Sequence, residues 1–266
     1  MNLGLKTAVI GDGPTTVVVV HGILGAGRNW RSFCRRLADR RPDLRIVLVD
    51  LRNHGSSPPA LGPHTLESCV DDLEELGRAE VVIGHSFGGK VALCWARRQP
   101  AGLKQAIALD AWPGIADDTS SQEVLGVIAS LRTVAVPAAA RNAVREQLAA
   151  RGLSPAIVGW LLTSLKRGDS GWVWQYDLDA IDEMLSDYFR TDLWPWMQSR
   201  AAGGPRVDVV WAERSARWTT DALARFATLP AAAQVRQHKL ADAGHWLHVD
   251  NPDGLTELLS GIVHSV

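Results

Sequence analysis

Ser86 lies in a context that favours a nucleophilic serine. It belongs to Gly84-His85-Ser86-Phe87-Gly88-Gly89, directly after the apolar run at residues 81–83 and directly before a segment of helical length. Small residues on both sides permit the sharp strand-to-helix turn that lifts a serine hydroxyl above a sheet, at the positive end of the next helix. A simple glycine turn is the alternative, since the bare pattern also arises by chance. The flanking strand and helix favour the nucleophile.

A second glycine-rich segment, His21-Gly22-Ile23-Leu24-Gly25, follows the apolar run at residues 17–20. In hydrolases with a serine elbow, one backbone N–H of the oxyanion hole comes from the loop after this strand, and the other comes from the residue after the nucleophile. We therefore expect Ile23 and Phe87 to supply the two donors. Taken alone, the segment would be better interpreted as a turn beside a core histidine, but its pairing with Ser86 favours the oxyanion hole.

A general base is required, because a serine hydroxyl is a weak nucleophile until its proton is removed. Among the eight histidines, His245 lies in Ala243-Gly244-His245-Trp246, between the last expected strand and the last expected helix, which begins near Pro252. This position satisfies the chain order serine, acid, histidine. His248 is the local alternative. We predict that His245 is the base.

The acid has two candidates. Asp110 ends the apolar strand that follows the elbow helix, where a carboxylate can orient an imidazole, although it can also be a simple turn cap. Many hydrolases place the acid after a later strand, but Ser215, which carries no charge, occupies that position here. Glu213 lies two residues earlier. We predict Asp110 as the acid, Ser215 as a supporting hydrogen-bonding residue and Glu213 as the alternative acid.

A parallel sheet would bring these residues together. Short β-branched runs predict buried strands at residues 15–20, 45–50, 80–84, 105–110, 206–211 and 234–240. Amphipathic segments between them predict helices at residues 29–40, 65–76 and 86–98. This alternation predicts an α/β fold with a doubly wound, mostly parallel sheet, which binds its ligand at the carboxyl ends of the strands.

The pattern changes between the two halves of this core. Residues 114–205 contain Ala-, Leu- and Trp-rich helical stretches without convincing strands, and we expect them to form a helical cap. The core would then consist of residues 1–113 and 206–266. Five of the eleven tryptophans fall in the expected cap: Trp160, Trp172, Trp174, Trp194 and Trp196. Such side chains can line an apolar pocket, but core packing is the better interpretation for any single one.

Composition favours a small-molecule substrate. The 266 residues carry 28 basic and 29 acidic side chains, so no strong field is expected for nucleic acid or an anionic membrane. Three cysteines lack metal-ligand spacing, and an odd number argues against a disulfide framework. No signal-peptide pattern begins the chain, and no apolar run approaches the roughly 20 residues that span a bilayer. We expect a cytoplasmic protein without metal or cofactor; the sequence does not predict its oligomeric state.

Together these segments resemble one branch of the α/β-hydrolase family, which contains small bacterial acyl esterases and thioesterases and the mitochondrial abhydrolase-domain proteins. The resemblance rests on Ser86 followed by Lys90, on residues 21–25, on Arg52-Asn53-His54-Gly55-Ser56-Ser57 and on Gly244-His245-Trp246. It implies the α/β-hydrolase fold, and it allows an acid at Asp110 with a serine at the later position. Ile23, Leu24 and Phe87 depart from the residues frequent in the branch, which affects only the shape of the pocket.

These residues predict a serine hydrolase that cleaves a small carboxylic ester or thioester through an acyl-enzyme intermediate. The same triad would also serve an acyltransferase, a carbon–carbon hydrolase or a lyase. The fold also occurs in non-catalytic binding proteins. Such proteins often lose a member of the triad, whereas every member can be filled here, which favours an enzyme.

Overall fold

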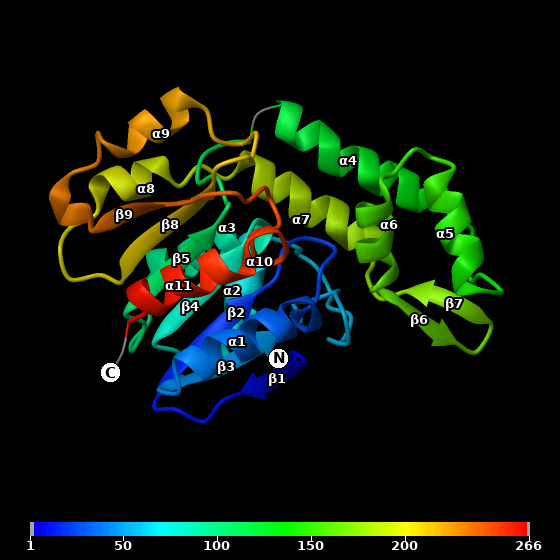
Figure 1. Cartoon of the computed structure of the whole chain (residues 1–266), viewed down its shortest axis with the longest axis horizontal. Coiled ribbons are helices and arrows are strands. Elements are labelled where there is room, and N and C mark those ends of the chain that lie inside the picture. The colour runs from blue at the N-terminus through cyan, green and yellow to red at the C-terminus, as the bar shows by residue number, and fades with distance from the viewer. Residues whose placement is uncertain (1–2, 117, 265–266) are drawn as a thin grey trace.

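A seven-stranded sheet forms the centre of the protein (Figure 1). The computed structural model describes residues 3–116 and 118–264. The strand order is β1-β3-β2-β4-β5-β8-β9, and all neighbours are parallel except β1 and β3. The strands are β1 (Thr7–Ile10), β2 (Thr15–Val20), β3 (Leu44–Val49), β4 (Val81–His85), β5 (Gln105–Leu109), β8 (Arg206–Ala212) and β9 (Val235–Leu240). The expected α/β fold is confirmed.

Apolar side chains cover both faces of the sheet, as the valine-rich runs require. Val18 and Val20 point into the layer beneath α2 (Leu66–Glu74) and α3 (Phe87–Arg98), and Val17 and Val19 point into the layer beneath α1 (Arg31–Arg40) and α11 (Pro252–Ile262). Successive side chains of a strand point to opposite faces, so an unbroken apolar run marks a strand covered on both sides. The sheet is therefore doubly wound, as expected.

The six expected strands agree with the observed ones to within one residue at each end. The helix expected at residues 29–40 begins as a 3₁₀ turn, η1 (Gly27–Trp30), before α1. The edge strand β1 was not expected. Its four residues follow no alternation of apolar and polar side chains, and Val9 is half exposed.

In the part of the chain that the structure describes, five helices and one hairpin separate β5 from β8. The helices are α4 (Asp118–Arg132), α5 (Arg141–Ala149), α6 (Pro155–Leu162), α7 (Leu178–Arg190) and α8 (Trp194–Ser199). The antiparallel hairpin of β6 (Leu165–Gly168) and β7 (Gly171–Trp174) contradicts the expectation of a segment without strands. These strands have only four residues each, too few for a readable period. Figure 1 shows α4, α5, α6 and the hairpin gathered at one end of the molecule. The division into core and cap at residues 114 and 205 stays a prediction.

Lys90 joins the helix after the elbow to this segment. Its side chain is fully buried, and its ammonium donates to the carbonyl oxygens of Gly114, Tyr188 and Thr191 at 2.7, 2.7 and 2.9 Å. A buried charge is tolerated only with such hydrogen bonds. Lys90 therefore holds the end of α7 and the chain after β5 against α3.

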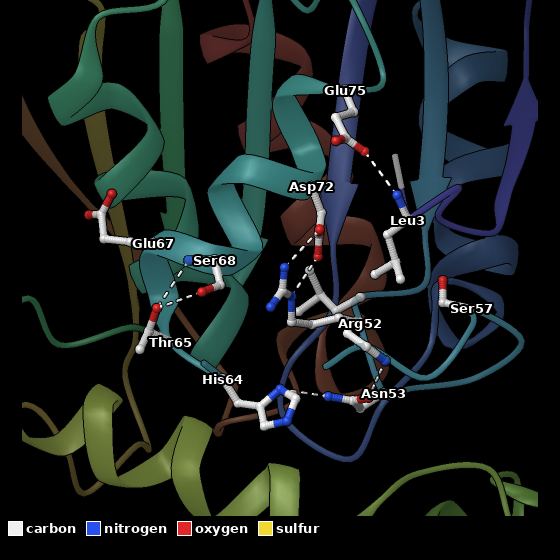
Figure 2. A network of polar contacts seen from close by, with 12 residues as sticks. Leu3, Arg52, Asn53, Ser57, His64, Thr65, Glu67, Ser68, Asp72 and Glu75 are labelled. Carbon is white, nitrogen blue, oxygen red and sulfur yellow. Dashed lines mark hydrogen bonds and ion pairs between the residues drawn. The ribbon is translucent and has the colours of Figure 1, made fainter. Parts of the chain in front are cut away.

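A buried ion pair fastens α2 to the loop after β3 (Figure 2). The guanidinium of Arg52 donates to both carboxylate oxygens of Asp72, from Nε at 2.6 Å and from Nη2 at 2.8 Å. Their side chains are 9% and 7% exposed. Arg52 Nη1 also donates to the carbonyl of Pro63. At the start of the same helix, the Thr65 side chain accepts from the backbone N–H of Ser68, which caps α2.

We expect Asp72→Ala to lower the free energy of unfolding by about 3–5 kcal/mol, because it leaves the Arg52 guanidinium buried without its partner. Asp71→Ala is the matched control on the same helix. Asp71 pairs with Arg98 at the surface, where an ion pair contributes about 0–1 kcal/mol. Urea unfolding of the three proteins measures both changes. Equal losses for the two variants would contradict the prediction.

Candidate active site

The chain turns sharply from β4 into α3 at Ser86. The serine adopts φ 53° and ψ −115°, and its backbone N–H donates to the carbonyl of Leu109 at 2.9 Å. Gly84 and Gly88 make the turn possible. A Cβ atom on Gly84 would lie 1.9 Å from the carbonyl oxygen of Gly88, and one on Gly88 would lie 2.4 Å from that of His21. Any larger residue would push the elbow away from the neighbouring loop.

Asp110 lies fully buried directly after β5 and accepts four hydrogen bonds. Its Oδ2 accepts from Nδ1 of His245 and from Oγ of Ser215, both at 2.7 Å. Its Oδ1 accepts from the Ala212 amide at 3.1 Å and from the Trp218 indole at 2.6 Å. The structure thus brings together the predicted acid, base and supporting serine.

Burial and hydrogen bonds together set the protonation states of Asp110 and His245. Burial alone would raise the pKa of Asp110, but the hydrogen bonds from His245, Ser215 and Ala212 outweigh it and hold the pKa below its ordinary value. Burial lowers the pKa of His245, and the hydrogen bond to Asp110 only partly opposes this. At neutral pH the pair is therefore a carboxylate and a neutral imidazole. Nδ1 carries the imidazole proton, which leaves the lone pair on Nε2 to act as a base.

The two alternatives lie elsewhere. Glu213 is exposed; its carboxylate pairs with Lys239 at 2.5 Å and accepts from the Asp242 amide at 3.1 Å. His248 stacks on Trp30 with a centroid distance of 3.9 Å, and its Nδ1 is buried without a partner among the described residues. Neither residue contacts Asp110 through any bond found in the described chain.

Ser86 and His245 line the same cavity, which has a volume of about 630 Å³. Within residues 3–116 and 118–264, the Ser86 hydroxyl makes no hydrogen bond, so it is free to donate to an imidazole. Hydrogen bonds of this kind are often formed only once a substrate is bound. The cavity therefore holds an unbonded hydroxyl and an imidazole that an acid orients.

The amides of Ile23 and Phe87 also lack an acceptor in the described part of the chain. The neighbouring amides do not: Leu24 donates to Nε2 of His54 at 3.1 Å, and Gly25 donates to the carbonyl of Gly22 at 3.0 Å. Both Ile23 and Phe87 line the cavity. A buried amide without a partner is costly, so two of them beside a serine suit a ligand oxygen that develops negative charge.

Two buried histidines hold the loop that carries Ile23. His21 donates from Nδ1 to the carbonyl of Gly22 at 2.7 Å and accepts from the Leu51 amide at 3.0 Å. His54 donates from Nδ1 to the carbonyl of Arg52 at 2.8 Å and accepts from Leu24. Each imidazole must be neutral to accept at Nε2. Burial lowers the pKa of His21 to about 4 and that of His54 to about 3.

Two functional side chains escaped the sequence analysis. His85 donates from Nε2 to the backbone carbonyl of His245 at 2.7 Å, and their rings lie 4.7 Å apart. Trp218 supplies one of the four donors to Asp110. His85 stands directly before Ser86 in the sequence. Many residue types occur at this position, so a histidine there does not by itself indicate a role. Trp218 follows Ser215 by three residues, and nothing in the sequence relates it to Asp110.

Apolar side chains form most of the cavity wall. Those from α4, α6 and α7 include Val127, Ile157, Trp160 and Leu185. Of the five tryptophans in the expected cap segment, Trp160 lines the cavity, and the other four pack in or against the hydrophobic core. The charged residues that line it are Glu123, Arg217 and Asp250.

The described residues contain neither a metal-ligand cluster nor a membrane-spanning helix. No group of three or more His, Cys, Asp or Glu side chains is placed to hold a metal ion. No helix there combines the length and the apolar character needed to cross a membrane.

Residues 17–258 match the model of the alpha/beta hydrolase family. The chain is 27% identical to the sn-1-specific diacylglycerol lipase ABHD11 of Danio rerio, over 90% of this chain and 75% of that protein. It is 26% identical to the esterase YbfF of Escherichia coli, over 96% of this chain and 95% of that protein. Among solved structures, a marine microorganism esterase superposes with a TM-score of 0.83 at 25% identity, over 96% of this chain and 98% of that one.

Asp110→Asn should lower kcat for hydrolysis of p-nitrophenyl acetate by about ten-thousand-fold, because an amide can donate to Nδ1 and so favours the wrong imidazole tautomer. Glu213→Gln, which changes an exposed carboxylate, should leave the rate at that of the parent. Steady-state kinetics on the three proteins measures both effects. If Glu213→Gln were the damaging change, the assignment of the acid would be wrong.

Stability should fall as the pH drops from about 6.5 toward 4. The unfolded chain binds protons on His21 and His54 near pH 6.5, whereas the folded chain binds them only near their lowered pKa values. The full contribution of these two histidines to the free energy of unfolding is therefore present above about pH 6.5, the pKa of a histidine in the unfolded chain. His54→Gln keeps a hydrogen-bond donor and an acceptor but removes the titrating group. It should therefore reduce the slope of the unfolding free energy against pH by about 1.4 kcal/mol per pH unit. Urea unfolding between pH 7 and 4.5 tests this, and an unchanged slope would contradict it.

Proposed function

The chain belongs to the alpha/beta hydrolase family, and from that premise we propose that it hydrolyses a small carboxylic ester or thioester through an acyl enzyme. Ser86 is the nucleophile, His245 the general base and Asp110 the acid. One observation carries this assignment: the imidazole held by a buried carboxylate opens into the same cavity as the elbow serine and two unbonded amides.

The proposed reaction has two halves. Ser86 Oγ attacks the carbonyl carbon while Nε2 of His245 takes the hydroxyl proton, and the amides of Ile23 and Phe87 stabilise the oxyanion. The protonated imidazole then gives its proton to the departing alcohol or thiol, which leaves an acyl group on Ser86. Water, deprotonated by His245, hydrolyses this acyl enzyme and restores the serine. Asp110 stabilises the imidazolium in both halves.

The size and lining of the cavity support a small or medium-sized substrate. Ligand pockets have volumes of roughly 300–1,000 Å³ and are mostly apolar, and this one falls within that range. Apolar side chains from α4, α6 and α7 would surround an acyl or alcohol group. The similarity to proteins named lipase and esterase supports an ester as the bond that is cleaved.

The alternatives have less support. A non-catalytic binding protein would not need an acid bonded to the imidazole or two free amides beside the serine. Acyl transfer, carbon–carbon hydrolysis or a lyase step would use the same triad, but the similarity to proteins named lipase and esterase favours the hydrolysis of an ester over each of them.

Ser86→Ala should reduce hydrolysis of p-nitrophenyl butyrate to the uncatalysed background, a loss in kcat on the order of a million-fold. It should also abolish covalent labelling by a fluorophosphonate probe. Ser199→Ala, at an exposed position on α8, is the control and should keep both. Hydrolysis by Ser86→Ala at the parent's rate would refute the proposed nucleophile.

A further inference from the structure

Arg217 is a cation in the cavity wall that has no hydrogen-bond partner among the described residues. It lies in the loop between β8 and α9 (Thr220–Phe226), and its side chain is only 18% exposed. A guanidinium carries five N–H donors. Across residues 3–116 and 118–264, none of these donors makes a hydrogen bond. The guanidinium nitrogens keep some contact with solvent, so these donors are open to a ligand that displaces water.

Asp110 does not bind the N–H donors of Arg217. The shortest approach of Arg217 to Asp110, from Nη1 to Oδ2, is 4.0 Å, which is too long for a hydrogen bond. Both oxygens of Asp110 are already occupied by the four donors described above. The carboxylate thus lowers the electrostatic cost of burying the guanidinium but leaves its donors unused.

The other acidic residues of the cavity wall do not bind these donors either. Glu123 of α4 and Asp250 of α10 (Leu247–Asp250) are both exposed. Asp250 accepts from the Gly244 amide at 2.8 Å. Within the described residues, the contact with Asp110 is the only ion pair that Arg217 makes. The surroundings therefore leave room for an anion supplied from outside the chain.

We propose that Arg217 is a specificity-determining residue that binds a carboxylate of the substrate, so that the preferred substrates are esters carrying a free carboxylate. The planar guanidinium matches a carboxylate through two parallel hydrogen bonds, and the partial burial of Arg217 strengthens that interaction. This inference rests on the proposed function, since it names the substrate class of the same site.

The position of Arg217 sets how far the carboxylate lies from the reacting bond. Nη1 of Arg217 and Nδ1 of His245 approach the same oxygen of Asp110, at 4.0 and 2.7 Å. The guanidinium therefore lies beside the imidazole that transfers protons to and from the substrate. A carboxylate bound there is only a few atoms away from the ester carbonyl, on either its acyl or its alcohol side.

Two matched substrate pairs test the proposal. On the acyl side, p-nitrophenyl hydrogen adipate is compared with p-nitrophenyl methyl adipate, its neutral methyl ester. On the alcohol side, m-acetoxybenzoate is compared with methyl m-acetoxybenzoate. The quantity measured is the ratio of kcat/KM for the anionic substrate to that for the neutral one. Within each protein, a change that affects both substrates equally cancels.

The variants separate a local contact from a general effect of charge. Arg217→Met removes the guanidinium but keeps much of the side-chain volume, and should lower the ratio by about 10- to 100-fold for at least one pair. Arg214→Met removes the same charge three residues earlier in the loop. Arg214 is exposed, lies outside the cavity lining and donates to the backbone carbonyl of Asp242, so its replacement should leave the ratio unchanged.

A second measurement needs no variant. In the parent protein, the preference for the anionic substrate should weaken as the salt concentration rises, because salt screens a partly exposed ion pair. This result stands even if Arg217→Met does not fold.

The outcomes distinguish the inference from the proposed function. A parent that hydrolyses both members of each pair, with ratios that neither Arg217→Met nor salt changes, overturns the inference alone. Equal losses on anionic and neutral substrates would show that Arg217 acts only by positioning Asp110, and would also overturn it. A parent that hydrolyses none of the four substrates overturns the proposed function and the inference with it.

Discussion

The buried carboxylate of Asp110 is the group on which the arrangement of the site depends. A charge with no exposure persists only if its oxygens are hydrogen-bonded. Here the donors found in the described chain come from the last residue of β8 and from the loops that follow β8 and β9. Satisfying the charge therefore places Ser215, Trp218 and His245 relative to the end of β5. The bond from His245 also orients its imidazole, while burial keeps that imidazole neutral, so the same arrangement satisfies a buried charge and prepares the proposed proton transfer.

A second set of bonds prepares the opposite side of the cavity. His21 and His54 link the loop after β2 to the loop after β3, and the ion pair of Arg52 with Asp72 fixes the latter loop to α2. Polar groups around the site thus have partners, with few exceptions. Among the described residues that line the cavity, the groups without a protein partner include the Ser86 hydroxyl, the two amides of the proposed oxyanion hole, Nδ1 of His248 and the Arg217 guanidinium. Groups left without a partner inside a satisfied network are the ones available to a ligand.

The segment between β5 and β8 closes the cavity and is tied to the core from both ends. Lys90 holds the end of α7, while Arg28 and Asn29 of η1 bond to Thr163 after α6, and Ser164 bonds to the carbonyl of Leu24. The last of these contacts reaches the loop that carries Ile23. Because the cavity wall and the loop of Ile23 share this contact, a shift of α6 would also move one of the two amides that we propose as oxyanion donors.

The sequence by itself determined the parallel strands, the elbow at Ser86 and the loop of Ile23, because each is a local pattern: an apolar run ended by small or polar residues. It favoured Asp110 over Glu213 and His245 over His248 without excluding either alternative, and it missed β1, the β6–β7 hairpin, His85 and Trp218. Only the tertiary structure decided which carboxylate meets which imidazole, and that Arg217 lines the cavity without a hydrogen bond to any described residue. Such relations join residues as far apart as Asp110 and His245, and distance along the chain carries no information about them.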